Sequence, residues 1–113
     1  MAGLIAAATL VVAPSTASAH YYGGCKGHHC KRHVVRPYRG WLASTRHCET
    51  RGLRFPYLAD TGNGFFGAYQ FTRSSWRAVG GRGEPNHATH TEQDYRAVKL
   101  LHLQGRGAWP VCG

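Results

Sequence analysis

Apolar residues in the second half of the chain recur at helical spacing, and the clearest case begins near residue 90. Over residues 90–104 they fall on one face, which predicts an amphipathic helix. Thr89, with Glu92 three positions on, matches a capping box, and Gly105 would end the helix. The apolar stripe consists of Tyr95, Val98, Leu100, Leu101 and Leu103.

A shorter helix is predicted ahead of it, from the spacing of Trp41, Thr45 and Cys48. Gly52 would end this helix, because glycine readily adopts the left-handed conformation that follows a helix. Glu49 would then lie near the C-terminal end of the helix.

The middle of the chain shows a different pattern. Residues 61–64 form a strong turn signal, and the aromatic residues of 65–71 predict a short strand or hairpin arm. Thr72 or Ser74 would then cap a helix that runs through Val79. We therefore expect a mainly helical α+β domain with one short β-hairpin-like segment.

The first apolar run, residues 4–13, is longer than any later one and contains a single polar residue, Thr9. It leads to Ala17-Ser18-Ala19, so we predict a signal peptide over residues 1–19 and a secreted or wall-associated product. A membrane helix needs about 20 apolar residues, so no membrane anchor is expected.

The size of the chain calls for covalent reinforcement. With 113 residues it has room for one domain, which we place at residues 41–113, and a core that small is commonly stapled by disulfides. Four cysteines, Cys25, Cys30, Cys48 and Cys112, suit an exported disulfide protein, and we expect a monomer.

The net charge of +9 adds a clue about partners. Residues 20–40 contain no acid and no periodic apolar pattern, which predicts a flexible basic arm. The positive electrostatic field of such a chain favours binding of nucleic acid, acidic lipid or the anionic polymers of a bacterial wall. The sign of the charge does not choose among these partners. Because most aromatic residues belong to the apolar pattern of the domain, nucleic acid is the least expected partner.

The arm also contains residues that bind metals, namely Cys25, His28, His29, Cys30 and His33. These could form a zinc or copper site. In an oxidising compartment, however, a disulfide between Cys25 and Cys30 is the better interpretation. We therefore expect no metal and no cofactor.

Acids are scarce, which limits the chemistry available to the chain. Glu92 and Asp94 would lie in the first helical turn, where negative charge is stabilising, and Asp60 would support the turn after it. Glu84 precedes a proline and would be solvated. On composition alone Glu49 would also be a surface residue, although it follows a cysteine and precedes an aromatic segment.

The order of several short motifs makes the chain recognisable. It resembles the transglycosylase-like domain of resuscitation-promoting factors, secreted actinobacterial proteins with a reduced lysozyme-like fold. The motifs are Trp41, Cys48-Glu49, residues 61–67 (TGNGFFG), Gln70-Phe71, Ser75-Trp76, Gly80-Gly81, Gln104-Gly105 and residues 107–112 (GAWPVC).

This resemblance implies roles for particular residues. It makes Glu49 the catalytic acid and pairs Cys48 with Cys112. It also implies that Phe65, Gln70, Ser75, Gln104 and Trp109 line a glycan cleft.

The resemblance also implies a reaction, cleavage of the β-1,4 bond between N-acetylmuramic acid and N-acetylglucosamine in peptidoglycan. Most glycosidases use two carboxyl groups, and no second one is convincingly placed here. A single acid suffices if the muramic acid C6 hydroxyl attacks its own anomeric carbon, so lytic transglycosylase chemistry is preferred over hydrolysis.

The segment after Glu49 departs from the family pattern. Thr50-Arg51 replaces the usual Ser-Gly, the loop that follows is longer, and an arginine near Glu49 would lower its pKa. Two alternatives therefore stay open: a non-catalytic wall-binding or signalling module, and a cationic antimicrobial or nucleic-acid-binding protein.

Overall fold

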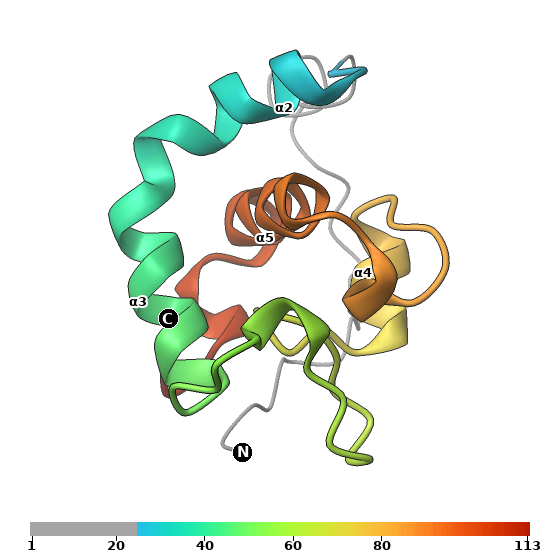
Figure 1. Cartoon of the computed structure of the whole chain (residues 1–113). Helices are drawn as coiled ribbons and strands as arrows, with labels where there is room; N and C mark the ends of the chain where they lie inside the picture. Colours follow the sequence, from blue (N-terminus) through green and yellow to red (C-terminus); the bar gives the residue numbers. More distant parts are fainter. Residues whose placement is uncertain (1–24) are drawn as a thin grey trace.

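A computed structural model describes residues 25–113 of the chain. The predicted signal peptide lies outside the described residues. Figure 1 shows an assembly of helices joined by short loops. Its α-helices are α2 (His28–Val35), α3 (Arg39–Glu49), α4 (Arg73–Ala78) and α5 (His90–Gln104). Its 3-10 turns are η1 (Arg36–Tyr38), η2 (Pro56–Leu58), η3 (Pro85–His87) and η4 (Arg106–Ala108).

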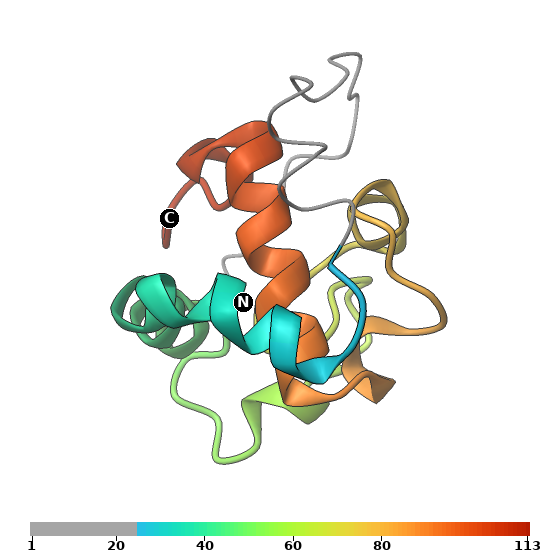
Figure 2. The ribbon, with the colours of Figure 1, turned by 90° about the horizontal axis from the view of Figure 1, so that it is seen from above.

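The helix α5 is the central element, seen end-on in Figure 1 and along its length in Figure 2. Its bounds agree with the prediction, and the Thr89 hydroxyl caps it by accepting a bond from the Glu92 amide at 3.2 Å. Tyr95, Val98 and Leu100 of its apolar stripe are at most 1% exposed, and Leu101 and Leu103 are partly buried against the same core. The Glu92 carboxylate accepts bonds from Lys31 and Arg96, so it ties α5 to α2.

The expectation of a flexible arm is wrong for residues 25–40. The helix α2 covers half of this segment and continues through η1 into α3, so that the three form one bent rod. In Figure 2 the α2 end of this rod crosses α5 and packs against it. Only two adjacent residues, Val34 and Val35, are buried in α2, and two neighbours cannot produce a 3.6-residue period. The helix is held instead by the Cys25–Cys30 disulfide and the Lys31–Glu92 ion pair.

The predicted hairpin is shorter than a strand pair. Phe66 and Phe71 exchange two backbone hydrogen bonds of 2.9 Å around a tight loop, and Phe66 also bridges to Asp60. Gly67 has φ +76°, and a β-carbon there would lie 2.4 Å from the Gln93 side-chain oxygen. Glycine at this position lets the loop close directly against α5.

The helix α4 is capped as predicted, by the Thr72 hydroxyl, which accepts a bond from the Ser75 amide at 3.1 Å. Its Trp76 is buried, with its ring 5.0 Å from that of Phe71. A β-carbon on Gly81 would lie 2.2 Å from the Trp76 ring, so glycine is required where the chain turns back over this side chain.

Both predicted disulfides are present, and Cys48–Cys112 joins the end of α3 to the C-terminal tail across 64 positions of sequence. The expected fold class is confirmed, since residues 25–113 are mainly helical and their β-structure is confined to isolated bridges. Within the same residues, no helix combines the length and apolar character needed to cross a membrane.

Candidate active site

Glu49 is the last residue of α3 and is 1% exposed. Its Oε2 atom is buried and has no hydrogen-bond partner among the described residues. Burial disfavours the charged carboxylate, and it raises the pKa of Glu49 from 4.5 to about 7. At neutral pH a large fraction of Glu49 is therefore protonated, as a proton donor requires.

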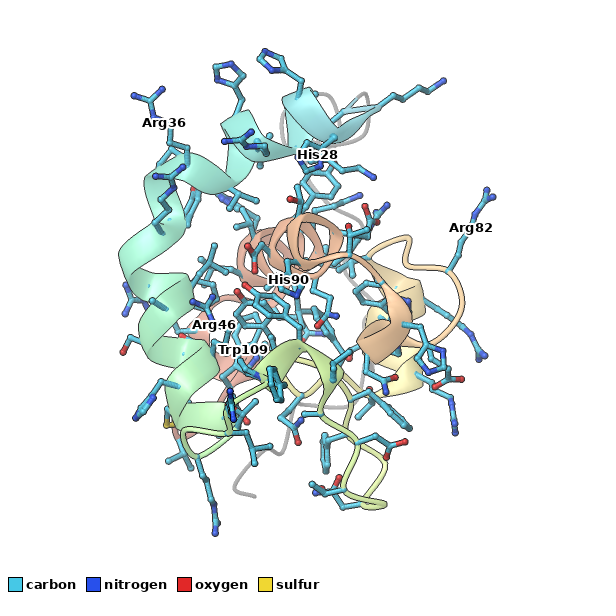
Figure 3. The ribbon with its side chains drawn as sticks, viewed as in Figure 1. His28, Arg36, Arg46, Arg82, His90 and Trp109 are labelled. Carbon is cyan, nitrogen blue, oxygen red and sulfur yellow. A yellow bond between two sulfur atoms is a disulfide. The ribbon has the colours of Figure 1, made fainter. Side chains whose placement is uncertain are left out.

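Trp41, in the first turn of α3, meets Trp109 from the C-terminal tail. The rings of Trp41 and Trp109 pack edge to face with centroids 5.0 Å apart. The Trp109 indole nitrogen donates to the Tyr69 backbone oxygen at 3.0 Å, which keeps the neighbouring Gln70 close to the same tryptophan. Figure 3 shows Trp109 in the interior near the lower part of α3, and the Cys48–Cys112 disulfide fixes the tail there.

Several buried polar atoms have no hydrogen-bond partner in the described residues. Within residues 25–113 there are four, and besides Glu49 Oε2 they are Gln70 Oε1, Gln104 Oε1 and Trp41 Nε1. Such atoms are costly and rare unless a ligand or ordered water satisfies them. Three of the four belong to residues that the sequence assigned to the site. Trp41 was not assigned, although its place at the head of the motif series was a signal.

Two other residues that were predicted to line the cleft, Ser75 and Phe65, lie in different surroundings. Ser75 is buried in the first turn of α4, and its hydroxyl donates to the Thr72 backbone oxygen at 3.1 Å, so it is engaged in the helix cap. Phe65 is half-buried at the loop tip, where its amide donates to the Asn63 side chain at 3.1 Å. The structure thus bonds Trp109 to the residue before Gln70, and it gives Ser75 a structural contact.

The unusual segment after Glu49 forms a tight turn. Thr50 is buried and its hydroxyl donates to the Arg46 backbone oxygen at 2.8 Å, whereas Arg51 is exposed with φ +51°. Among the described residues no arginine contributes to the pKa shift of Glu49. An arginine would lower this pKa only if it approached Glu49, and the turn leaves Arg51 in solvent.

The longer loop is fixed by a polar network that the sequence did not reveal. The Tyr57 hydroxyl donates to Asp94 at 2.8 Å, and the Tyr69 hydroxyl donates to the same carboxylate oxygen. Arg46 donates to both hydroxyls at 3.0 Å, and it points inward from α3 in Figure 3. Burial and the neighbouring Asp94 raise the pKa of both tyrosines, that of Tyr57 to about 12. We call these four residues the tyrosine network.

The candidate metal ligands do not gather into a site. Cys25 and Cys30 form a disulfide, while His28, His29 and His33 are exposed on α2. Across residues 25–113, no three His, Cys, Asp or Glu side chains lie where they could share a metal ion.

The described residues form a disulfide-linked helical domain with one buried acid, and comparison with known proteins gives its family. The family model described as "Transglycosylase-like domain" matches residues 42–112, and the chain belongs to this family. The prediction of a reduced, lysozyme-like, disulfide-stapled domain is thereby confirmed.

Several curated relatives are resuscitation-promoting factors. The chain is 54% identical over 65 residues to Rpf of Micrococcus luteus, covering 58% of this chain and 28% of that protein. It is 44% identical over 66 residues to RpfE of Mycobacterium tuberculosis, covering 58% and 37%. For RpfC of the same species, identity is 40% over 77 residues, covering 68% and 52%. The chain thus spans about a quarter to a half of these relatives' lengths.

Proposed function

We propose that this protein is a secreted enzyme that cleaves peptidoglycan at the β-1,4 bond between N-acetylmuramic acid and N-acetylglucosamine, as a lytic transglycosylase. The observation that carries the proposal is Glu49, a buried acid with an unpartnered oxygen and a pKa of about 7. Membership of the transglycosylase-like family supports it.

The contacts of the other carboxylates are consistent with a reaction that uses one acid, because each of them forms an ion pair or hydrogen bond in the fold. Glu84 pairs with Arg73 at 2.9 Å, and Glu92 pairs with Lys31 and Arg96. Asp94 accepts from two tyrosines, and Asp60 accepts from the Gly62 amide at 3.1 Å in an exposed turn. The chain has only these four acids besides Glu49, and the structural partner of each supports a reaction with a single catalytic carboxyl group.

The reaction proceeds in two proton transfers. Protonated Glu49 donates its proton to the glycosidic oxygen as the bond to the muramic acid anomeric carbon breaks. The resulting carboxylate accepts the proton of the C6 hydroxyl while that oxygen bonds to the anomeric carbon. The products are a 1,6-anhydro end and a free N-acetylglucosamine hydroxyl, and Glu49 is protonated again.

The unpartnered polar atoms supply groups for binding the sugar. The Gln70 and Gln104 amide oxygens accept hydrogen bonds from N-acetyl amides or hydroxyls, and the Trp41 indole donates one. The aromatic rings of Trp109 and Phe65 offer apolar faces to sugar rings. Ser75 holds the α4 cap, and its contribution to binding is indirect.

The proposed location is the outside of the cell. Both cysteine pairs are oxidised, which fits an oxidising compartment, and residues 1–19 have the pattern of a signal peptide. We propose that the protein acts as a monomer on the glycan strands of the wall and needs no cofactor.

The test compares Glu49→Gln with the matched control Glu84→Gln on purified, insoluble peptidoglycan. The control should release soluble muropeptides at the wild-type rate, and Glu49→Gln should lose at least about 100-fold, the scale of one proton-transfer catalyst. Release by Glu49→Gln at the control rate would overturn the proposal. Binding to peptidoglycan without release by the wild type would favour the non-catalytic wall-binding module instead.

A further inference from the structure

The outer face of the α2–η1–α3 rod carries an uninterrupted row of basic side chains. They are His29, Arg32, His33, Arg36 and Arg39, all exposed, and together they line an open groove of about 420 Å³. Every lining side chain is basic. Figure 3 shows Arg36 pointing away from the rest of the molecule. We call this set the basic row.

The rod that carries the basic row is attached to the rest of the domain by residues outside the row. The opposite side of the rod fixes it through the Lys31–Glu92 ion pair, the buried Val34 and Val35, and the Cys25–Cys30 disulfide. A hydrogen bond of 2.7 Å between Tyr38 and His102 adds a fourth tether. One face of the rod is therefore packed against the domain, and the opposite face carries exposed basic side chains.

A bound anion would relieve the repulsion between neighbouring basic side chains of this row. Residues three and four apart on a helix are neighbours, and like charges at that spacing repel. The acids that could relieve the repulsion are engaged elsewhere. The nearest hollow, shared with Arg32 and Arg39, contains Arg46 and Asp94, and the Asp94 carboxylate already accepts from Tyr57 and Tyr69.

We propose that the basic row binds a phosphodiester polymer of the bacterial wall, at a site separate from Glu49. This identity of the ligand rests on the proposed function, which places the protein at the wall. Three of the five groups are arginines, whose planar forks match phosphate oxygens. Eleven residues of helical rod span roughly 15 Å, enough to contact several phosphates of one chain.

Other polyanions fit the row less well. Single-stranded nucleic acid is bound through aromatic stacking platforms, and no Phe, Tyr or Trp lines this groove. An anionic membrane is bound by helices with an apolar face beside the basic one, but the apolar residues of α2, Val34 and Val35, are buried in the core.

The experiment measures binding of soluble poly(glycerol phosphate) to the full chain at several salt concentrations. The row variant carries Arg32→Gln, Arg36→Gln and Arg39→Gln. The control variant carries Arg77→Gln, Arg82→Gln and Arg106→Gln, which remove the same charge from other exposed positions. Unchanged helical circular dichroism of both variants establishes that they fold.

We expect the row variant to weaken binding about tenfold and to flatten its salt dependence, because released counterions scale with phosphates contacted. The control should change affinity by less than about threefold. Equal losses in the two variants would overturn the site, since net charge alone would then explain binding. Tighter binding of an oligothymidylate, or of phosphatidylglycerol vesicles, at equal phosphate would overturn the wall polymer as ligand.

The same variants separate this proposal from the enzymatic one. Glu49→Gln should bind poly(glycerol phosphate) as the wild type does, and the row variant should cleave polymer-free peptidoglycan at the wild-type rate. If Glu49→Gln still cleaves, the proposed activity fails while the binding result stands. If Glu49→Gln loses polymer binding, the two sites are not separate and this proposal fails.

Discussion

The residue that decides the chemistry is Glu49, and its surroundings account for its protonation. It ends α3 with its side chain buried, and desolvation outweighs every effect that would favour the charged form. A carboxyl with a pKa of about 7 can donate a proton at neutral pH and accept one in the next step. One side chain can therefore serve both halves of the proposed reaction.

This pKa predicts the pH dependence of the reaction. The first step needs protonated Glu49, so the rate on substrate-saturated enzyme should fall as pH rises above about 7, approaching tenfold per pH unit. Initial rates of muropeptide release between pH 5 and pH 9 measure this. A rate that stays level up to pH 9 would show that another group donates the proton.

The same burial predicts a change in stability. Between pH 4.5 and about 7 the folded state keeps a proton on Glu49 that the unfolded state has lost. The contribution of protonated Glu49 to the free energy of unfolding is therefore fully present below pH 4.5 and is lost as pH rises through about 7. Glu49→Gln removes the effect, and at pH 9 it should unfold with a free energy up to about 3 kcal/mol higher than the wild type. Urea titrations at pH 4 and pH 9 test this, with Glu84→Gln as control. An advantage of the same size at both pH values would contradict it.

At the scale of elements, the tyrosine network positions the loops around Glu49. Arg46 belongs to the same helix as Glu49, one turn earlier, and Asp94 belongs to α5. Tyr57 and Tyr69, from two different loops, lie between them. Tyr69 also bonds Trp109 through its backbone oxygen, so the network connects the longer loop to the tryptophan pair.

Removing one hydroxyl from the network should therefore cost stability. Tyr69→Phe leaves a half-buried carboxylate and a guanidinium with one partner fewer, and the expected loss is about 1–3 kcal/mol in the free energy of unfolding. Tyr38→Phe, which removes an exposed bond to His102, should lose less than about 1 kcal/mol. Equal losses in urea unfolding would show that the network is no stronger than a surface hydrogen bond.

At the scale of the whole molecule, the two disulfides have unequal effects. Cys48–Cys112 closes a loop of 64 positions and Cys25–Cys30 one of five. On the chain-entropy model these stabilise the fold by about 4 and about 2 kcal/mol. The Cys48–Cys112 bond also holds the tail that carries Trp109 near the end of α3 that carries Glu49. The Cys25–Cys30 bond joins the residues before α2 to its first turn.

Paired serine substitutions test this difference. Cys48→Ser with Cys112→Ser should lower the thermal midpoint more than Cys25→Ser with Cys30→Ser, and it alone should also slow peptidoglycan cleavage at a temperature where both variants are folded. A larger loss of stability from the Cys25 pair would contradict the account.

The sequence predicted those parts of the molecule whose signals are local. Thr72 and Thr89 cap the helices they were expected to cap, because a hydroxyl three residues before an amide needs no tertiary partner. The helix α2 was missed because its stability comes from a disulfide, an ion pair and two adjacent valines. None of these produces a periodic pattern.

The candidate site was predicted only in part, because several of its contacts join residues that lie far apart in the sequence. Glu49 and the Cys48–Cys112 pairing followed from a family resemblance, not from composition. The tyrosine network could not be predicted, because it joins residues from α3, α5 and two loops whose approach depends on the finished fold. Ser75 matched a family motif, yet its hydroxyl is held within its own helix cap.

The most direct test of the one-acid mechanism is mass spectrometry of fragments released from purified peptidoglycan in water enriched in oxygen-18. Transglycosylation adds no water, so the muramic acid ends should be one water lighter than hydrolysed ends and should contain no heavy oxygen. Muramic acid ends that carry oxygen-18 would show hydrolysis and contradict the account.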